Sequence, residues 1–327
     1  MHAMNNHRLR RRSVMIGAIA TMPIGSPRAQ SWPAGPLKLL VPFGPGGSTD
    51  IMGRLLASGL QQNLNVQVVV ENRGGGATSL GTELAARAAP DGQTWLVTSD
   101  SFAVLPALVP NLSFDVTRDF APVTLIATAP NVIAVHPSRP WRALAEVVAA
   151  ARGGNLSYAS TGNGTTGHLA MTRFAAGAGV RMAHAAYRSG GLALNDAVAG
   201  HVDMIIGSAA LLAPQIADGR LRPIVQLGEA RLPAMASVPT SAEEGFPDFL
   251  AETWWGVLAP ARTPAAMIDA MLGATRAAFQ EARVAQQVTQ TQQARLRLDG
   301  PEAMRIFLAG QVATWGAVIR DHRITAD

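Results

Sequence analysis

Short apolar runs alternate with helix-length segments along most of this chain. The run LKLLV at Leu37–Val41 is followed by a glycine-rich loop and by apolar residues at helical spacing, and the same order recurs at residues 66–89. After a break it begins again, with a run at residues 156–159 and a helical pattern at residues 168–176. Repeated strand–helix units of this kind form mainly parallel sheets covered by helices. The sequence therefore predicts an α/β fold.

Two groups of predicted strands divide the chain, and 327 residues of 48% hydrophobic composition suffice for two domains. We expect strands near residues 183–187, 202–206 and 221–226 to complete a second sheet. After Pro260 two long helical patterns follow without new strands, so we place the C-terminal segment on the first lobe and expect two crossings that form a hinge. The predicted organisation is a signal peptide at 1–30, lobe 1 at 31–128, lobe 2 at 129–255 and the rest of lobe 1 at 256–327.

The N-terminal segment has the features of a secretory signal. Arginines at positions 10–12 precede an apolar run at residues 14–24, and small and helix-breaking residues follow. Eleven apolar residues span about 16 Å as a helix, which is roughly half of a bilayer core. We therefore expect an exported periplasmic protein, and the consecutive arginines are also compatible with a twin-arginine route.

Charge and composition exclude several classes of function. The leader holds five of the 27 basic residues and none of the 22 acidic ones, so the two kinds balance in the remainder. A nucleic-acid partner would require a basic surplus, which is absent after removal of the leader. Lys38 is the only lysine and there is no cysteine, which excludes Schiff-base, Walker-lysine and thiolate chemistry.

Three predicted strand-to-helix loops, at residues 43–50, 74–79 and 160–166, are rich in glycine, serine and threonine. In open parallel sheets such loops lie at the carboxyl ends of strands, where ligands bind. Glycine allows close backbone approach, and helix N-termini favour negative charge. Because Gly47 is followed by Ser48 and not by lysine, we expect a small carboxylate here rather than a phosphate. An acid in the first turn of a helix is more often a dipole partner than a ligand, and we interpret Asp50 in this way.

Other motifs in the sequence do not indicate a cofactor or metal. Residues 162–167 match G-x-G-x-x-G after a predicted strand, but residues 181–188 hold no acid for a ribose. His136, His184, His201 and His322 have no metal-ligand spacing. We therefore expect neither a cofactor nor a metal ion.

Several short motifs follow one another along the chain after the leader. They are VPFGPGGSTD at residues 41–50, VENR at 70–73, APDG at 89–92, YASTGNG at 158–164, YRSGG at 187–191, GHVD at 200–203, VPT at 238–240 and PARTP at 260–264. Their order resembles that of the Bug-type substrate-binding proteins of tripartite tricarboxylate transporters, and the resemblance covers nearly the whole chain after the leader. It implies a type II periplasmic-binding-protein fold in which each of two lobes is a mainly parallel sheet flanked by helices, with a two-stranded hinge, and a small organic acid as ligand.

The resemblance also implies which positions hold the ligand. Thr78 departs from the usual small residue of the second loop and adds a hydroxyl there. Ser101, Ser189 and Ser208 are added because they follow strands that face the same cleft. The candidate ligand-binding residues are Phe43, Gly46, Gly47, Ser48, Ala77, Thr78, Ser101, Thr161, Gly164, Thr165, Thr166, His168, Ser189 and Ser208.

These observations favour a non-catalytic monomeric receptor that delivers an organic acid to membrane transporter subunits. One alternative is a secreted serine hydrolase that uses Ser48, Ser79 or Ser101, with His168 as the base. A second is a ligand sensor that signals through a membrane partner. Turnover of a bound acid distinguishes the receptor from the hydrolase.

Overall fold

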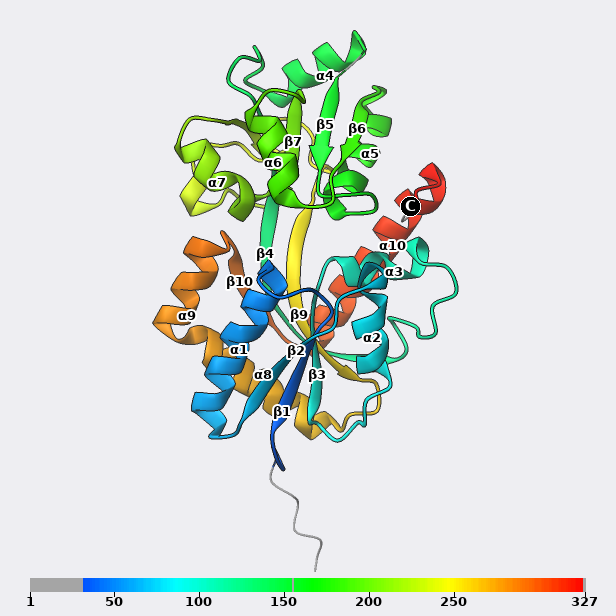
Figure 1. Cartoon of the computed structure of the whole chain (residues 1–327), viewed down its shortest axis with the longest axis vertical. Helices are drawn as coiled ribbons and strands as arrows, with labels where there is room; N and C mark the ends of the chain where they lie inside the picture. Colours follow the sequence, from blue (N-terminus) through cyan, green and yellow to red (C-terminus); the bar gives the residue numbers. More distant parts are fainter. Residues whose placement is uncertain (1–31, 155, 326–327) are drawn as a thin grey trace, which may run out of the picture. The chain divides into compact units, whose positions relative to one another are not determined.

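The computed structural model describes residues 32–154 and 156–325 of the chain. The predicted signal peptide therefore lies outside the described residues. The described chain forms a ten-stranded sheet with helices packed against it (Figure 1). We call the part built on β1 (Leu37–Val41), β2 (Val68–Asn72) and β3 (Thr94–Ser99) the first half. The part built on β5 (Ser157–Ser160), β6 (Ala183–Ala186) and β7 (Met204–Ser208) is the second half.

The first half follows the predicted strand–helix order closely. A run of apolar residues makes β1 a buried strand at the predicted residues, and the loops after β1 and β3 lead directly into helices. β1 pairs in parallel with both β2 and β3. Its elements are β1 (Leu37–Val41), α1 (Ser48–Leu64), β2 (Val68–Asn72), a 3₁₀ turn (Gly76–Thr78), α2 (Ser79–Ala86), β3 (Thr94–Ser99) and α3 (Ser101–Leu108).

The second half repeats the pattern, with β5 parallel to β6 and to β7. The carboxyl ends of β5 and β7 lead into α5 and α7, as those of β1 and β3 lead into α1 and α3. Its elements are α4 (Leu144–Arg152), β5 (Ser157–Ser160), α5 (Thr166–Ala178), β6 (Ala183–Ala186), α6 (Gly190–Val198), β7 (Met204–Ser208), α7 (Ala209–Ala217) and β8 (Arg222–Gln226).

Two long strands connect the halves. β4 (Phe120–Val135) and β9 (Glu252–Pro260) run antiparallel, and β4 continues to pair with β7 and β8 (Figure 1). The strand order is β2-β1-β3-β9-β4-β7-β5-β6, with β8 and β10 also paired to β4. The expected second sheet is present and is continuous with the first, because the sixteen residues of β4 belong to both halves.

The segment after β9 also differs from the expectation that it adds no strand. Helices α8 (Ala265–Gln280) and α9 (Ala282–Gln286) are followed by a π turn (Gln287–Thr291) and then by β10 (Arg295–Asp299). β10 alternates charged and apolar residues, which suits a half-buried strand, and it pairs antiparallel with β4. The return of the chain to the sheet places Gln292 close to the connecting strands.

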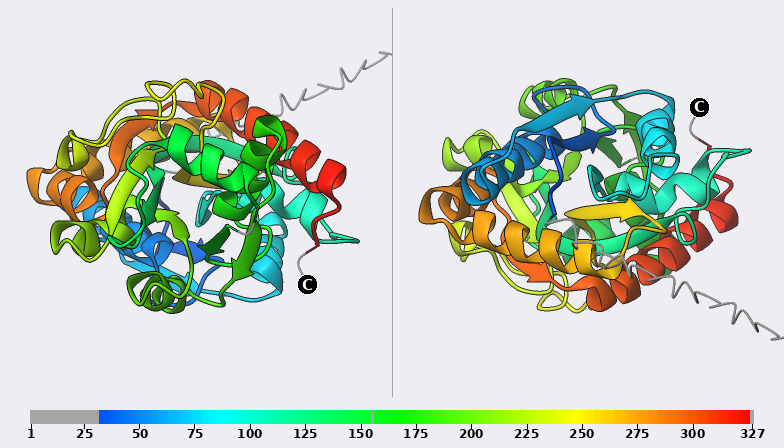
Figure 2. Two further views of the ribbon diagram at one scale, coloured as in Figure 1. Left: turned by 90° about the horizontal axis from the view of Figure 1, so that it is seen from above. Right: turned by 90° about the horizontal axis from the view of Figure 1, so that it is seen from below.

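The last helix, α10 (Pro301–His322), contacts the cores of both halves. Met304 and Leu308 pack with β3 and α3, whereas Trp315 and Ile319 pack with residues of β5 and α5. Both views of Figure 2 show this helix, coloured orange to red, along the outer side of the described residues. The last helix thus packs on both halves. The lobe limits stay a prediction.

Candidate ligand-binding site

A cavity of about 450 Å³ lies where the strand-to-helix loops of the two halves meet. The first half contributes the loops after β1 and β3 and the 3₁₀ turn before α2. The second half contributes the loops after β5 and β7, and the connecting strands close the cavity from behind. Its lining residues are Phe43, Gly47, Ser48, Thr49, Ala77, Thr78, Ser99, Asp100, Ser101, Val104, Leu108, Asn131, Thr161, Asn163, Gly164, Thr165, Thr166, Gly167, Ile206, Gly207, Ser208, Ala210, Leu211, Thr253, Trp255 and Gln292.

The N-terminus of α1 forms one wall of this cavity. Gly47 precedes the helix in an extended conformation (φ −75°, ψ 166°), and no side chain caps the helix there. The first amides of an α-helix have no partner within the helix, so those after Gly47 are available to an anion. A side chain on Gly47 would meet nothing closer than the Gly44 oxygen, 3.9 Å from the added Cβ.

Asp50 holds the loop that leads into α1. Its carboxylate accepts hydrogen bonds from Gly46 N (2.8 Å), Arg54 Nε (2.9 Å) and Asn72 Nδ2 (2.9 Å). Burial alone would raise the pKa of Asp50, but these hydrogen bonds outweigh it and lower the pKa. The hydrogen-bond partners of Asp50 thus belong to the protein itself. This agrees with its interpretation as an acid that stabilises the start of the helix and not as a ligand contact. The amide of Gly46 is also used by this contact, and Gly46 does not line the cavity, contrary to expectation.

The second loop presents two residues in the left-handed region. Ala77 has φ 51° and Thr78 has φ 78°, and both line the cavity. Such a backbone is unfavourable for residues with a side chain, and it persists only where the surroundings enforce it. Thr82 Oγ1 donates to the carbonyl of Thr78 at 2.8 Å, and the hydroxyls of Thr78 and Ser101 lie 3.5 Å apart. Both of these strained residues therefore lie in the cavity wall.

The N-terminus of α5 forms the facing wall. Thr165 precedes the helix without capping it, since its hydroxyl donates instead to the carbonyl of Gly162 at 2.8 Å. The amides that begin α5 are therefore not satisfied by a side-chain cap, as at α1. Two uncapped helix N-termini, one from each half, thus border the same cavity.

His168 contacts the α5 loop and is not among the residues that line the cavity. Its Nδ1 accepts a hydrogen bond from Gly164 N at 3.1 Å, and its ring stacks on that of His184 at 3.9 Å. Burial and the neighbouring His184 lower the pKa of His168 to about 4. The ring supports the loop that lines the site.

Two predicted serines cap helices. Ser189 Oγ accepts from Leu192 N at the start of α6 and does not line the cavity. Ser208 Oγ accepts from Leu211 N at the start of α7, and Ser208 does line it. Eleven of the fourteen candidate residues therefore border the cavity, and Gly46, His168 and Ser189 do not.

Sequence reasoning missed Asp100, which follows β3 and lines the cavity. Thr166 Oγ1, at the start of α5, donates a hydrogen bond to its carboxylate and so joins the two halves. Burial raises the pKa of Asp100, against hydrogen bonds from Thr166, Ser99 and the nearby backbone. The sequence held one signal for Asp100, because it follows a predicted strand and ligands bind beyond the carboxyl ends of parallel strands.

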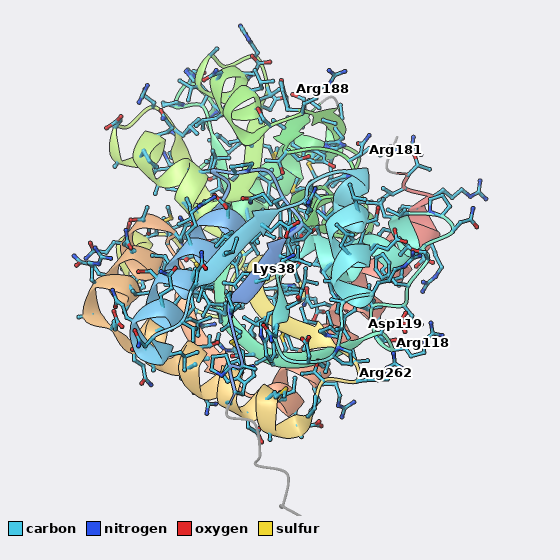
Figure 3. All side chains as sticks on the ribbon, turned by 60° about the horizontal axis from the view of Figure 1, so that its bottom comes forward. Lys38, Arg118, Asp119, Arg181, Arg188 and Arg262 are labelled. Atoms are coloured by element: carbon cyan, nitrogen blue, oxygen red, sulfur yellow. The ribbon has the colours of Figure 1, made fainter. Side chains whose placement is uncertain are left out.

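The cavity wall contains no cationic side chain among the described residues. Figure 3 shows Arg118 and Arg262 near Asp119 on the first half, while Arg181 and Arg188 lie on the second. Lys38 lies on β1 and pairs with Glu71 at 2.9 Å. Any anion in the cavity would therefore be held by backbone amides and hydroxyls.

The hydrolase alternative finds little geometric support. His168 Nδ1 accepts from a backbone amide. Two serine–histidine pairs of the described chain, Ser160 with His184 and Ser138 with His136, each lie 2.7 Å apart, and neither pair lines the cavity. Ser160 is 1% exposed and does not line the cavity, so a substrate cannot reach it. Within residues 32–154 and 156–325, no group of three or more acids and histidines could hold a metal ion, and no helix is long and apolar enough to span a bilayer.

A model of the tripartite tricarboxylate transporter family receptor matches residues 52–324. The chain belongs to this receptor family. The protein BugT of Bordetella pertussis is 33% identical to it over 308 residues, covering 93% of this chain and 94% of BugT. The family's members are periplasmic solute-binding receptors, and the expected family is thus confirmed.

Solved structures that are similar in sequence share the fold. The periplasmic binding protein BugD superposes with a TM-score of 0.74 at 28% identity, covering 89% of this chain and 98% of BugD. Rpa4515 of R. palustris, solved with adipate, gives 0.77 at 27% identity, covering 90% and 99%. MatC of Rhodopseudomonas palustris, solved with bound malate, gives 0.75 at 25% identity, covering 88% and 100%. The predicted α/β periplasmic-binding-protein fold is therefore confirmed.

Proposed function

We propose that this receptor binds a small organic acid in the cavity between its halves and delivers it to the membrane subunits of a tripartite-type transporter. The observation that carries the proposal is the pair of uncapped helix N-termini, α1 and α5, on opposite walls of one cavity. Helix N-termini favour negative charge and present amide donors. The absence of cationic side chains from the described wall makes these amides the main positive feature of the site.

The two walls must act on the same molecule. A hydrogen bond to a charged acceptor contributes about 1.5–3 kcal/mol net, and immobilising a ligand offsets several such bonds. Neither wall offers enough donors to bind a carboxylate tightly alone. We infer that the halves close on the ligand about β4 and β9, which are the two strands that pair along the connection. The lobes would then be residues 31–128 with 256–327, and residues 129–255.

Two proteins of similar structure support the ligand class, since Rpa4515 was solved with adipate and MatC with malate. A cavity of about 450 Å³ suits molecules of this size. The lining residues predicted from sequence would supply the contacts, with Phe43, Gly47 and Ser48 on one wall and Thr161, Gly164 and Thr165 on the other. The receptor would act as a monomer without catalysis.

A melting experiment with a panel of small molecules tests this function. At a ligand concentration of a hundred times Kd, binding stabilises the folded state by about 2.7 kcal/mol, which is readily seen as a shift in Tm. We expect mono- and dicarboxylates to raise Tm, and sugars and nucleotides to leave it unchanged. A panel in which only sugars or nucleotides raise Tm would contradict the proposal. Release of an alcohol from an ester in the same assay would favour the hydrolase.

Export can be tested separately. The small and polar residues around Ala29 follow the apolar run at the usual distance for signal peptidase, so we expect cleavage after about residues 29–31. N-terminal sequencing of protein recovered from the periplasm checks this. A chain that still begins at Met1 in the membrane fraction would contradict the proposed export.

A further inference from the structure

The two connecting strands form most of the floor of the cavity (Figure 1). Alternate residues of a strand point to opposite faces of the sheet, and the register pairs Ala129 of β4 with Thr253 of β9. Asn131, Thr253 and Trp255 therefore share one face, and all three line the cavity. Gln292, which ends the turn before β10, lines the same cavity. We call these four lining residues the floor.

Gln292 brings an unpaired carboxamide to the floor. The residue is 4% exposed, and its side chain forms no hydrogen bond within the described chain. Its amide atoms are not among the fully enclosed polar atoms that lack a partner, so the exposed part of the residue includes them. Three positions along from the pair of Arg295 and Thr128, the antiparallel register leads to Gln292 and Asn131. The floor thus holds a donor and an acceptor that the protein itself does not use.

Asn131 adds an acceptor of fixed identity. It is 5% exposed, and its Nδ2 donates to the carbonyl of Ala251 at 3.2 Å. An amide oxygen in the place of Nδ2 would face that carbonyl oxygen, so this hydrogen bond fixes which amide atom is which. Oδ1 has no hydrogen-bond partner within the described chain, and it is not among the fully enclosed atoms either. Asn131 therefore offers the cavity an oxygen that accepts a hydrogen bond.

These two amides limit which group of a ligand suits the floor. Neither is charged, and the uncapped helix N-termini belong to the walls. A carboxylate has no hydrogen to donate to Asn131 Oδ1, and an apolar group would leave both amides unpaired. A hydroxyl donates and accepts, so it can pair with both. Sites that hydrogen-bond a ligand hydroxyl strongly reject the analogue that lacks it, because their buried polar groups are then left unpaired.

We propose that Asn131 and Gln292 recognise a hydroxyl group of the ligand, so that the receptor selects hydroxy acids among the organic acids. This rests on the proposed function of the cavity as an organic-acid site. The hydroxyl donates to Asn131 Oδ1 and accepts from Gln292 Nε2, while the carboxylate takes the amides at the helix N-termini. Neither amide carries a charge that would offset an ammonium group, and amino acids are the rival class in the test.

Calorimetric titration with matched ligands tests the selection. Each set holds one acid and the same skeleton with a hydroxyl or with an amine, as both enantiomers. The sets are propionate, lactate and alanine; butyrate, 3-hydroxybutyrate and 3-aminobutyrate; succinate, malate and aspartate; adipate, 2-hydroxyadipate and 2-aminoadipate; and 3-phenylpropionate, 3-phenyllactate and phenylalanine. We expect the tightest ligand to be a hydroxy acid that binds at least about tenfold more tightly than the other members of its set. A tightest ligand without a hydroxyl, or a smaller preference, would overturn the proposal.

The variant Gln292→Met separates recognition from a structural role. Methionine keeps the shape of the side chain without the amide, and no hydrogen bond within the described chain is lost. The preference for the hydroxy acid over the unsubstituted acid should fall at least about threefold. If Gln292 only packed against its neighbours, both ligands would weaken equally and the preference would persist, which would overturn its role. Gln293→Met is the matched control, since Gln293 lines a different cavity, and it should keep the preference.

Asn131→Leu tests the acceptor in the same way. This variant also loses the hydrogen bond to Ala251, so all ligands are expected to bind more weakly. The preference within a set should fall only if Oδ1 contacts the hydroxyl, and an unchanged preference would contradict the proposal. If this variant does not fold, Gln292→Met still decides the outcome. If no acid binds the parent, with or without a hydroxyl, the proposed function itself fails, and this inference fails with it.

Discussion

The carboxylate of Asp50 accepts a hydrogen bond of 2.8 Å from the backbone N–H of Gly46, so helix α1 holds the loop that leads into it. Asn72 extends the contact from the end of β2, because its Nδ2 donates both to Asp50 and to the carbonyl of Phe43. The start of α1 and the end of β2 thus together fix the loop beside Gly47. The shape of this wall is set by side chains that do not touch the cavity.

Replacement of Asp50 by Asn should therefore weaken both the fold and the site. Asp50 is buried, and disruption of a buried hydrogen-bonded acid costs about 1–3 kcal/mol. Urea unfolding measures this loss, and calorimetry should show weaker ligand binding in the same variant. The control Asp218→Asn, which removes an exposed partner of Arg220, should change the free energy of unfolding by less than about 1 kcal/mol. Unaltered stability and binding in Asp50→Asn would show that the loop is held by other contacts.

Gly47→Val should abolish ligand binding without unfolding the protein. The backbone of Gly47 suits a residue with a side chain, and an added Cβ has room, but the side chain would cover the amides of α1. Gly44→Val is a matched control on the same loop, since a Cβ there meets nothing within 4 Å and Gly44 does not line the cavity. Melting curves with and without ligand compare the two. Equal ligand shifts in both variants would place the ligand elsewhere.

Thr165→Val should weaken ligand binding about tenfold, which corresponds to about 1.4 kcal/mol. The substitution keeps the shape of the side chain but removes the hydroxyl that donates to Gly162, so the α5 loop is less firmly held. Thr289→Val removes a similar hydroxyl bond, to Ala285, outside the cavity and should leave the affinity unchanged. Calorimetry measures the affinities of both variants. Binding by Thr165→Val as tight as that of the parent would show that this hydroxyl does not contribute to ligand binding.

The stability of the receptor should fall as the pH is lowered from about 6.5 to about 4. The pKa of His168 is lowered to about 4 in the folded protein, so the unfolded chain binds this proton first as the pH falls. Protonation of Nδ1 would also break the bond from Gly164 N. His168→Asn keeps an acceptor near the same place without titrating, so its urea midpoint should vary less over this pH range. If the urea midpoint depends on pH equally in the parent and the variant, His168 does not cause the loss of stability at low pH.

Local sequence patterns predicted the repeated strand–helix units. They failed where contacts between residues distant in sequence determine whether a strand forms or where a side chain lies. β1 begins and ends at the predicted residues because its apolar run is bounded by clear loop signals. β4 was missed because Pro122 and Pro130 interrupt its sequence, although partner strands on both sides stabilise it. His168 was placed in the site because sequence does not show that His184 lies against its ring. Asp100 was missed because its environment depends on Thr166, in the other half.

Native mass spectrometry of the receptor, purified from its own periplasm without added ligand, tests the central claim most directly. The parent protein and Gly47→Val are compared side by side, with Gly44→Val as the control. The account predicts that the parent and Gly44→Val carry a small organic acid that is absent from Gly47→Val. A bound sugar or nucleotide, or an acid retained equally by Gly47→Val, would contradict it.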